Sequence, residues 1–590
     1  MKKINTLFLF SICTIALTGQ NSNAFVTYCE QSGFKKTPRY AETIDFCQRL
    51  AEASPLAHYT TFGKSPQGRD LPLLIVDKDR LFTPQEVRKT DKVVMLIEAC
   101  IHSGEPDGKD AGLMFLRDLL IHNKHREILD HVTILFIPIF NVDGHENFSA
   151  LNRINQNGPE ELGSRNTAQN LNLNRDFLKA DALEMHHWLD LYHTWLPEFF
   201  MDVHVTNGAD FQYVSTYAIE MNNHFMEANI RKWSKEVFEK HFTEQMAAIK
   251  FPVFPYFEPF SWNNADAGVV CQSYPPQYST GYAAAMNRVG LLIENHIYKP
   301  YEQRVKATYE MIRISGQILN KEHQNLRRSI ALSDQTVASS AFRVEPMPLS
   351  YQTSRRDSVM IDFLGWERKT IKSDLSGADW TIHDYESPIT KRVWLYAVPI
   401  VQQSVRLPDA YIIKPECIDA ISVLDRHKIE YSRLEEGAAM LVETHRFTTI
   451  QFSQRLNEGR ITVTPEFTTQ PERLFFPAGS VLVSMNQIRA RLVANLFEPN
   501  GPTSLLFWGY FMPWSQPASQ ISVNVGYMEV KGREMLAQDP QLRKIFEEKK
   551  ATDPEFANNP QAILQFFMTE LRKNVEPTNN QYPVGRIFYR

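Results

Sequence analysis

The chain has 590 residues, of which 43% are apolar and 22% are charged, the composition of an ordinary globular protein. A chain of this length is expected to form two or three domains, because single cores rarely extend beyond about 300 residues. Its 63 basic and 68 acidic residues give a formal net charge of −5 without a long basic block, which argues against nucleic acid as a partner.

The first 24 residues have the pattern of a secretory signal peptide. Two lysines follow Met1, an apolar stretch runs from Leu7 to Gly19, and Ser22-Asn23-Ala24 offers small residues for cleavage after Ala24. The apolar stretch is too short to span a membrane, and no later stretch approaches spanning length. We therefore expect an exported protein, periplasmic or secreted, with no membrane span.

Six cysteines are present, and Cys13 would leave with the signal peptide. Cys29 and Cys47 lie close together near the start of the mature chain, where an oxidising compartment would permit a disulfide. The spacing leaves open whether they are bonded.

The next 300 residues alternate between strand and helix patterns. Apolar runs bounded by turn residues predict strands, and apolar residues at helical spacing predict helices. Predicted strands are 71–76, 93–99, 132–140, 198–205 and 289–296, and predicted helices are 41–53, 107–122 and 301–326. This alternation is typical of an α/β domain that binds ligands at the carboxyl ends of its strands.

The pattern changes after about Ser329. Short alternating runs between residues 340 and 470, with frequent turn residues, predict a β-rich region. Helical patterns follow at 487–496, 533–550 and 561–573. We therefore expect a signal peptide (1–24), a catalytic domain (25–330) and a β-rich C-terminal region with a helical end (331–590).

A candidate metal site follows the strand that ends at Ala99. His102 and Glu105 lie in a turn of small residues, and imidazole and carboxylate are both good Zn²⁺ ligands. His204, at the end of a later strand, supplies a third ligand, and three protein ligands leave one position for water. These residues predict a site for one zinc ion.

Two further groups suit metal-assisted hydrolysis of an amide next to a free carboxylate. Arg175 with Asn174 offers a planar charged fork that can hold a carboxylate through two hydrogen bonds. Glu294 ends an apolar strand, where it could act as a general base for the attacking water and return the proton to the leaving amine.

These landmarks occur in the order found in zinc metallocarboxypeptidases of the carboxypeptidase A type. The resemblance covers roughly residues 35–325, and the chain looks like the large exported bacterial members with an extra C-terminal region. The resemblance implies a three-layer α/β/α sandwich around a mixed, mostly parallel eight-stranded sheet. Its landmarks are His102-Ser103-Gly104-Glu105, Asn141-Val142-Asp143-Gly144, Leu173-Asn174-Arg175-Asp176-Phe177, His204 and Leu292-Ile293-Glu294.

The resemblance also implies roles for individual residues. His102, Glu105 and His204 would bind zinc, Glu294 would be the general base and acid, and Asn174 and Arg175 would hold the substrate's terminal carboxylate. A second arginine in such enzymes stabilises the oxyanion, and Arg165 is preferred over Arg153 because it lies in the loop leading to Asn174. A tyrosine commonly closes over the substrate, for which Tyr278 and Tyr282 are the candidates.

Two positions differ from the digestive members of the family. Gly104 replaces the arginine that precedes the metal-binding glutamate there, so one contact to the substrate is missing. Asn172 stands where those enzymes have an aspartate that orients the first zinc histidine, and an amide accepts that imidazole proton less strongly. Asp202, two residues before His204 on the same face of its strand, could supply the missing charge.

The sequence thus predicts an exported zinc exopeptidase that hydrolyses the C-terminal bond of peptides with a free terminal carboxylate, using water activated by zinc and Glu294. An alternative on the same scaffold is a peptidase for cell-wall peptides or an amide deacylase. An alternative outside enzymes is an inactive protein that binds peptides or glycans. Side-chain specificity and oligomeric state stay open.

Overall fold

The computed structural model describes residues 25–206, 210–261, 267–515, 524–575 and 580–589. The signal peptide expected at 1–24 lies outside the described residues.

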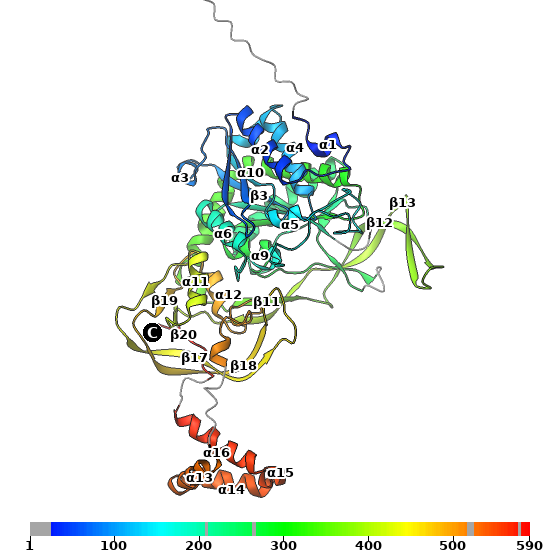
Figure 1. Ribbon diagram of the computed structural model, residues 1–590. Helices are drawn as coiled ribbons and strands as arrows, with labels where there is room; N and C mark the ends of the chain where they lie inside the picture. The colour runs from blue at the N-terminus through cyan, green and yellow to red at the C-terminus, as the bar shows by residue number, and fades with distance from the viewer. Residues whose placement is uncertain (1–24, 207–209, 262–266, 516–523, 576–579, 590) are drawn as a thin grey trace, which may run out of the picture.

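A mixed eight-stranded sheet organises the first half of the chain (Figure 1). The four central strands β4, β3, β5 and β10 run parallel, while β1, β2 and β6 join antiparallel to their inner neighbours. The predicted α/β fold with an eight-stranded sheet is confirmed. In spatial order the strands are β1 (Ala57–Lys64), β2 (Asp70–Val76), β4 (Val132–Ile137), β3 (Val93–Ala99), β5 (Phe199–Thr206), β10 (Val289–His296), β6 (Ser215–Ala218) and β7 (Val253–Pro255).

Helices cover both faces of this sheet because its central strands are apolar on both sides. Alternate residues of β3 enter different cores: Val93, Met95 and Ile97 join one, and Val94 and Leu96 the other. The first core includes α2 (Tyr40–Ala53), α4 (Asp107–Leu120), α7 (Ala228–Trp233), α8 (Lys240–Ala248) and α10 (Tyr301–Val337). The second includes α6 (Leu183–Trp195) and α9 (Ser279–Ala285).

Shorter helical segments connect these elements. They are α1 (Tyr28–Gln31), α3 (Pro84–Val87), η2 (Arg126–Asp130), α5 (Val142–Glu146), η3 (Leu173–Arg175), the π-helical η4 (Ser234–Glu239), η6 (Ser340–Arg343) and η7 (Met512–Ser515).

The second half of the chain forms three further sheets and a helical end, as expected. A six-stranded sheet has the order β16 (Ser432–Arg433), β19 (Val481–Ser484), β15 (Ala410–Ile413), β20 (Val584–Ile587), β17 (Ala438–Phe452) and β18 (Val463–Phe476). Its helices α11 (Ile418–Arg426) and α12 (Ala490–Phe497) enter the second core of the catalytic sheet, so the two halves share a hydrophobic interior. Figure 1 shows α13 (Val525–Gln538), α14 (Pro540–Thr552), α15 (Pro554–Ala557) and α16 (Pro560–Val575) as a separate lobe below this region.

Two strands of the C-terminal region return to the catalytic half. The strands β12 (Val359–Lys372) and β13 (Asp379–Tyr396) form a long antiparallel hairpin, which projects to the right in Figure 1. This hairpin belongs to a four-stranded sheet because β13 pairs with β9 (Val269–Val270), which pairs with β8 (Glu258–Pro259). A two-stranded sheet of β11 (Met347–Thr353) and β14 (Pro399–Val405) lies at its base.

Within the described residues no helix is long and apolar enough to cross a membrane. Cys29 and Cys47 are both buried and are free thiols.

Candidate active site and metal centre

The turn after β3 is held in place by the segment that follows β4. Cys100 adopts a left-handed conformation, with φ of 57°, and reverses the chain at the end of the strand. The backbone N–H groups of Phe140 and Asn141 donate to the carbonyls of Ala99 and Cys100, and Ser103 Oγ donates to the carbonyl of Asn141 at 2.6 Å. These bonds fix the turn that carries His102 and Glu105.

Three ligand atoms converge at the carboxyl ends of β3 and β5. The Nδ1 atoms of His102 and His204 are 3.1 Å apart, and each lies 3.0–3.3 Å from a carboxylate oxygen of Glu105. All three side chains are buried. Zinc bound tetrahedrally at normal distances keeps its ligands about 3.3 Å from one another, so the spacing fits one zinc ion.

The outer nitrogen of each histidine ring has a partner of its own. The Nε2 of His102 lies 3.0 Å from Oδ1 of Asn172, and the Nε2 of His204 lies 2.8 Å from Oδ2 of Asp202. With zinc bound, these partners would accept the ring proton on Nε2 and leave both Nδ1 atoms to face the metal as ligands. Asp202 thus occupies the position expected from its place two residues before His204.

The protonation of the ligands also suits a metal. Burial lowers the pKa of His102 to about 4, which keeps its imidazole neutral. Burial opposes ionisation of Glu105, but its interactions with His102 and Arg153 hold its pKa well below the ordinary range. Burial opposes the charged form of His204, but the charges of Asp202 and Glu105 raise its pKa well above the ordinary value, so zinc would have to displace a proton from this ring. A neutral imidazole and a carboxylate are the forms that bind zinc, so the donor set fits the ion once that proton has left.

Arg153 fills the space beside Gly104. Its Nη1 donates to Glu105 at 2.7 Å and its Nη2 to the carbonyl of Val205 at 2.8 Å. A Cβ at residue 104 would lie 2.7 Å from Cδ of Arg153. The glycine that distinguishes this turn from the digestive enzymes therefore makes room for an arginine from another loop, which orients the metal-binding carboxylate.

A pocket of about 400 Å³ opens onto the metal site and collects most of the predicted substrate groups. Arg165, Asn174, Arg175 and Tyr278 all line it. Arg165 lies 3.1 Å from Nδ1 of His102, and its side chain is 44% exposed, compared with 13% for Arg153. This greater access favours Arg165 as the arginine that meets a substrate carbonyl.

Arg175 and Tyr278 lie against each other in this pocket. The guanidinium carbon of Arg175 is 4.5 Å from the centre of the Tyr278 ring. Its Nη1 donates to the backbone carbonyl of Asn174 at 2.7 Å, and this bond fixes the orientation of the guanidinium group. The buried Oδ1 of Asn174 has no hydrogen-bond partner among the described residues. The roles of these groups toward a substrate stay predictions.

Glu294 faces the pocket from β10, directly beside His204 of β5 in the parallel register. Burial, with the charges of Glu105 and Asp202, raises the pKa of its carboxyl, whereas the charge of His204 lowers it. A cation bound beside it would favour the carboxylate form. A carboxylate in this position can accept a proton from water.

Tyr282 does not take part in the pocket, and its prediction as a substrate contact is corrected by the structure. Its side chain is fully buried, and its hydroxyl lies 2.9 Å from Nε2 of His193 and 2.8 Å from Nδ1 of His427. The helix α9 begins at Ser279, so Tyr278 precedes it in an extended conformation while Tyr282 follows the helix into the core. Of the two tyrosines, only Tyr278 reaches the pocket.

Some pocket residues were not singled out from the sequence. Tyr256 and Tyr274 line the pocket from segments without a regular pattern, and the hydroxyl of Tyr256 accepts a hydrogen bond from Thr206 at 3.3 Å. Other lining residues come from the β12–β13 hairpin: Phe363, Gly365, Trp366, Arg368, His383, Lys391 and Val393. No local sequence signal marks their proximity to His204.

A second group of metal-type donors comprises Asp91, His131 and His323. The two imidazole rings stack at 3.7 Å with an angle of 5° between their planes, so their nitrogen lone pairs do not converge on one point. The carboxylate of Asp91 lies 3.5 Å from His131 and 3.3 Å from His323. This arrangement is that of a carboxylate beside a stacked pair of imidazoles.

Comparison with known proteins agrees with this geometry. Residues 43–195 match the model of the peptidase M14 family, zinc carboxypeptidase. No curated protein sequence matches the chain.

Solved structures similar to the chain include a metallo-carboxypeptidase from Burkholderia cenocepacia (16% identity, TM-score 0.36, covering 48% of this chain and 69% of that one). A second is a metallo-carboxypeptidase from Pseudomonas aeruginosa (14% identity, TM-score 0.36, covering 49% of this chain and 70% of that one). A third is the carboxypeptidase A from Helicoverpa armigera (15% identity, TM-score 0.37, covering 49% of this chain and 75% of that one). From the family match and the His-Glu-His centre, we conclude that the chain carries a zinc carboxypeptidase domain of the peptidase M14 family.

Proposed function

We propose that this protein is an exported exopeptidase that releases the C-terminal residue of peptides with a free terminal carboxylate. The observation that carries this proposal is the common pocket of the metal ligands, Glu294 and Arg175. A base beside a metal site suits hydrolysis, and a guanidinium in the same pocket suits a terminal carboxylate.

The mechanism follows from where these groups lie. Arg175, with Asn174, would bind the terminal carboxylate and so place the last peptide bond beside the metal site. When bound at His102, Glu105 and His204, zinc supplies Lewis acidity that polarises a carbonyl and acidifies water.

Two residues complete the reaction. Glu294 would take a proton from the attacking water and deliver it to the nitrogen of the departing amino acid. Arg165 would donate hydrogen bonds to the carbonyl oxygen as negative charge develops there. The tyrosines around the pocket would exclude water from the bound peptide.

Export rests on the first 24 residues, which carry the charge, apolar length and small residues of a cleaved leader. N-terminal sequencing of the protein recovered from outside the cytoplasm should begin at Phe25. Recovery of the full-length chain from the cytoplasm alone would contradict export.

The activity is tested with a peptide and its C-terminal amide. The free acid should be cut at its last bond in a chelator-sensitive reaction, and the amide should be cut at least about 100-fold more slowly because it lacks the charge that Arg175 binds. Glu294→Gln should retain zinc and lose turnover. Equal cleavage of acid and amide would contradict an exopeptidase that recognises the terminal carboxylate.

A further inference from the structure

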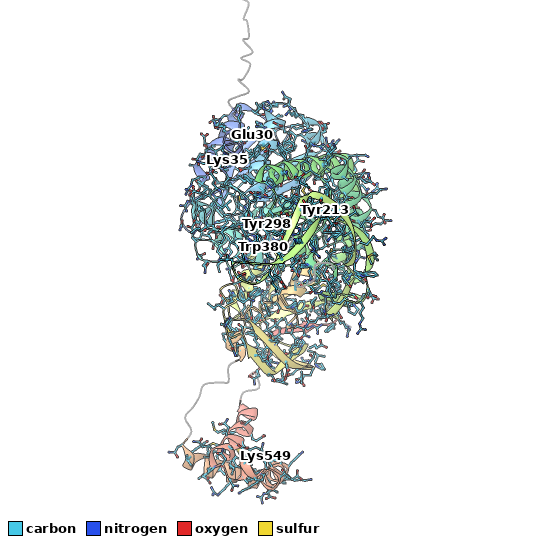
Figure 2. The ribbon with its side chains drawn as sticks, turned by 90° about the vertical axis from the view of Figure 1, so that its right-hand side faces the viewer. Glu30, Lys35, Tyr213, Tyr298, Trp380 and Lys549 are labelled. Carbon is cyan, nitrogen blue, oxygen red and sulfur yellow. The ribbon has the colours of Figure 1, made fainter. Side chains whose placement is uncertain are left out.

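The segment that carries the proposed carboxylate clamp, Asn174 and Arg175, is held by the C-terminal region. Residues 173–182, here called the clamp segment, begin with η3 and end at Ala182, directly before α6. Figure 2 shows the six-stranded sheet of the C-terminal region directly against the catalytic domain, whereas the helical lobe labelled at Lys549 lies apart from them. The clamp segment lies where these two halves of the chain meet, because side chains of the C-terminal region bond to it.

The clamp segment is closed on itself by the carboxylate of Asp176, the residue after Arg175. Its two oxygens accept the backbone N–H groups of Asp181 and Ala182 at 2.9 and 2.8 Å, and Lys179 forms an ion pair with it. Both Asp176 and Lys179 are buried. Because a buried carboxylate joins the two ends of this loop, a displacement at Asp181 is passed to Asp176 and so to the backbone of Arg175.

Two side chains of the C-terminal region hold the outer end of the loop at Asp181. Nε and Nη2 of Arg460 donate to the two carboxylate oxygens of Asp181 at 2.6 and 2.5 Å. The hydroxyl of Tyr510 lies 2.9 Å from Oδ1 of Asp181 and 2.9 Å from the carbonyl oxygen of Lys179. The guanidinium carbon of Arg460 lies 4.0 Å from the centre of the Tyr510 ring. Only 16% of the Asp181 side chain is exposed, so salt screens this ion pair weakly.

The ionisation of Asp181 reflects these contacts. Burial opposes the charged form, but the hydrogen bond from Arg460 and the charge of Lys179 lower the pKa of Asp181 to about 2. Asp181 is therefore a carboxylate at neutral pH, and the pair with Arg460 is an interaction between full charges.

The backbone of the loop is also held from the end of α11. Nη1 of Arg426 donates to the carbonyl of Ala180 at 2.8 Å, and Nε2 of His427 donates to the carbonyl of Leu178 at 2.8 Å. His186 of α6 donates to the carbonyl of Ala180 as well. Ala180 has a φ of 54°, in the left-handed region that residues other than glycine rarely adopt. A loop in this conformation depends on surrounding contacts for its shape, and part of that support comes from the C-terminal region.

The turn that carries Arg460 has a fixed position of its own. It connects β17 with β18, and the backbone N–H groups of Asn457 and Arg460 each donate to the carbonyl of the other at 2.8 and 3.0 Å. Gly459 has a φ of 81°, and a Cβ at this position would lie 3.0 Å from Cδ2 of Leu171. The turn thus packs directly against the chain just before the clamp segment, and it presents Arg460 to Asp181 from a rigid element.

We propose that Arg460, acting through Asp181, is a positioning residue for Arg175, so that the C-terminal region sets the alignment of the carboxylate clamp. This inference rests on the proposed exopeptidase function and adds a residue to its substrate site. A displacement of about 1 Å in a group that orients a substrate can cost about 100-fold in rate. Loss of the Arg460 pair should cost less, about 10-fold, because Phe177 and Leu178 of the same loop remain anchored in the core.

The test compares a free-acid peptide with its C-terminal amide, using the full zinc-loaded chain. Arg460→Gln should lower kcat/KM for the free acid by about 10-fold, mainly through a higher KM, and should change cleavage of the amide by less than about threefold. The double variant Arg460→Gln, Asp181→Asn should match Asp181→Asn alone, because both substitutions remove the same interaction. Arg460→Lys should recover part of the free-acid activity, since it restores one charged contact.

The matched control is Arg446→Gln on β17. Nη2 of Arg446 donates to both carboxylate oxygens of Glu472 at 2.7 and 2.9 Å, and its side chain is 26% exposed, compared with 30% for Arg460. Glu472 lies on β18, so this pair joins two strands of the C-terminal sheet and not the clamp segment. The control should leave both rates unchanged. Unchanged zinc content and circular dichroism would show that the variants are folded.

Amide hydrogen exchange tests the positioning without a substrate. In Arg460→Gln the backbone N–H groups of residues 176–182 should exchange at least about threefold faster than in the parent chain, while those of β3 should not change. Arg446→Gln should leave exchange in both segments unchanged.

The outcomes separate this inference from the proposed function. A parent chain that cuts the acid and the amide equally, or cuts neither, contradicts the exopeptidase proposal, and the exchange measurement then decides whether Arg460 positions the segment that carries Arg175. If the parent prefers the free acid, an equal fall in both rates in Arg460→Gln, or no change in either, would overturn the inference and leave the exopeptidase function intact. Unchanged exchange at residues 176–182 would overturn it in either case.

Discussion

Asp202 accepts a hydrogen bond from Nε2 of His204 at 2.8 Å, and so a carboxylate supports one zinc histidine while an amide, Asn172, supports the other. The carboxylate strengthens its imidazole as a ligand more than the amide does. His204 is therefore expected to be the stronger zinc ligand of the two histidines.

Asp202→Asn should weaken zinc binding about 10- to 100-fold, because the substitution keeps the size of the side chain and removes the charge behind His204. The measurement is a chelator competition titration of the zinc-loaded protein. Asp190→Asn is a suitable control, since Asp190 pairs with Lys428 at the surface. Unchanged zinc affinity would show that Asp202 does not support the metal.

Asn172→Asp should have the opposite effect. A carboxylate at this position would accept the Nε2 proton of His102 more strongly, so zinc should be retained at higher chelator concentration than in the parent chain. The side-chain oxygen of Asn172 also accepts the N–H of Asn174 at 3.1 Å, a bond that aspartate preserves. Faster zinc loss from this variant would contradict the argument.

Arg175→Gln should lower kcat/KM for a free-acid peptide by about 100-fold or more, because it removes the guanidinium that we propose binds the terminal carboxylate. The same variant should change cleavage of the amidated peptide little, so that the preference for the free acid disappears. Steady-state kinetics on both peptides distinguishes this result from a general loss of folding, which would lower both rates together.

The metal centre was predictable from the sequence because each of its two parts has a local signal and the order of the family landmarks joins them. A strand end followed by His102 and Glu105 indicates a site, and the spacing of two between Asp202 and His204 places both on one face of a strand. The packing of the hairpin is not local. The pairing of Val269 with Leu395 joins residues far apart in the chain, and no periodic pattern specifies which distant strands meet.

Tyr278 and Tyr282 show a different limit on what the sequence can predict. Tyr278 and Tyr282 are one helical turn apart, so a helix that included both would place them on the same face. Because α9 begins at Ser279, Tyr278 lies outside the helix and turns toward Arg175, while Tyr282 is buried. An error of one residue in a helix boundary is enough to reverse such a prediction.

Tyr282→Phe should therefore affect stability and not catalysis. The substitution leaves the ring nitrogens of His193 and His427 without their shared hydroxyl in a buried site, at a cost of about 1–3 kcal/mol. Chemical denaturation should reveal this loss, while kcat/KM stays within about threefold of the parent. Tyr278→Phe should show the reverse pattern, with normal stability and altered kinetics.

Glu220 should make the stability of the fold depend on pH. Burial raises the pKa of its carboxyl to about 7 in the folded state, compared with 4.5 for an ordinary glutamate. Between these two values the folded state holds a proton that the unfolded state has released, so this group's contribution to stability is full below pH 4.5 and is lost as the pH rises to about 7. The integrated loss is of order 3 kcal/mol.

Glu220→Gln should flatten the fall in unfolding free energy across this window, measured by denaturant titration at a series of pH values. Glu236→Gln, at an exposed position on η4, serves as the control and should leave the profile unchanged. A Glu220→Gln profile parallel to that of the parent would show that another group controls the transition.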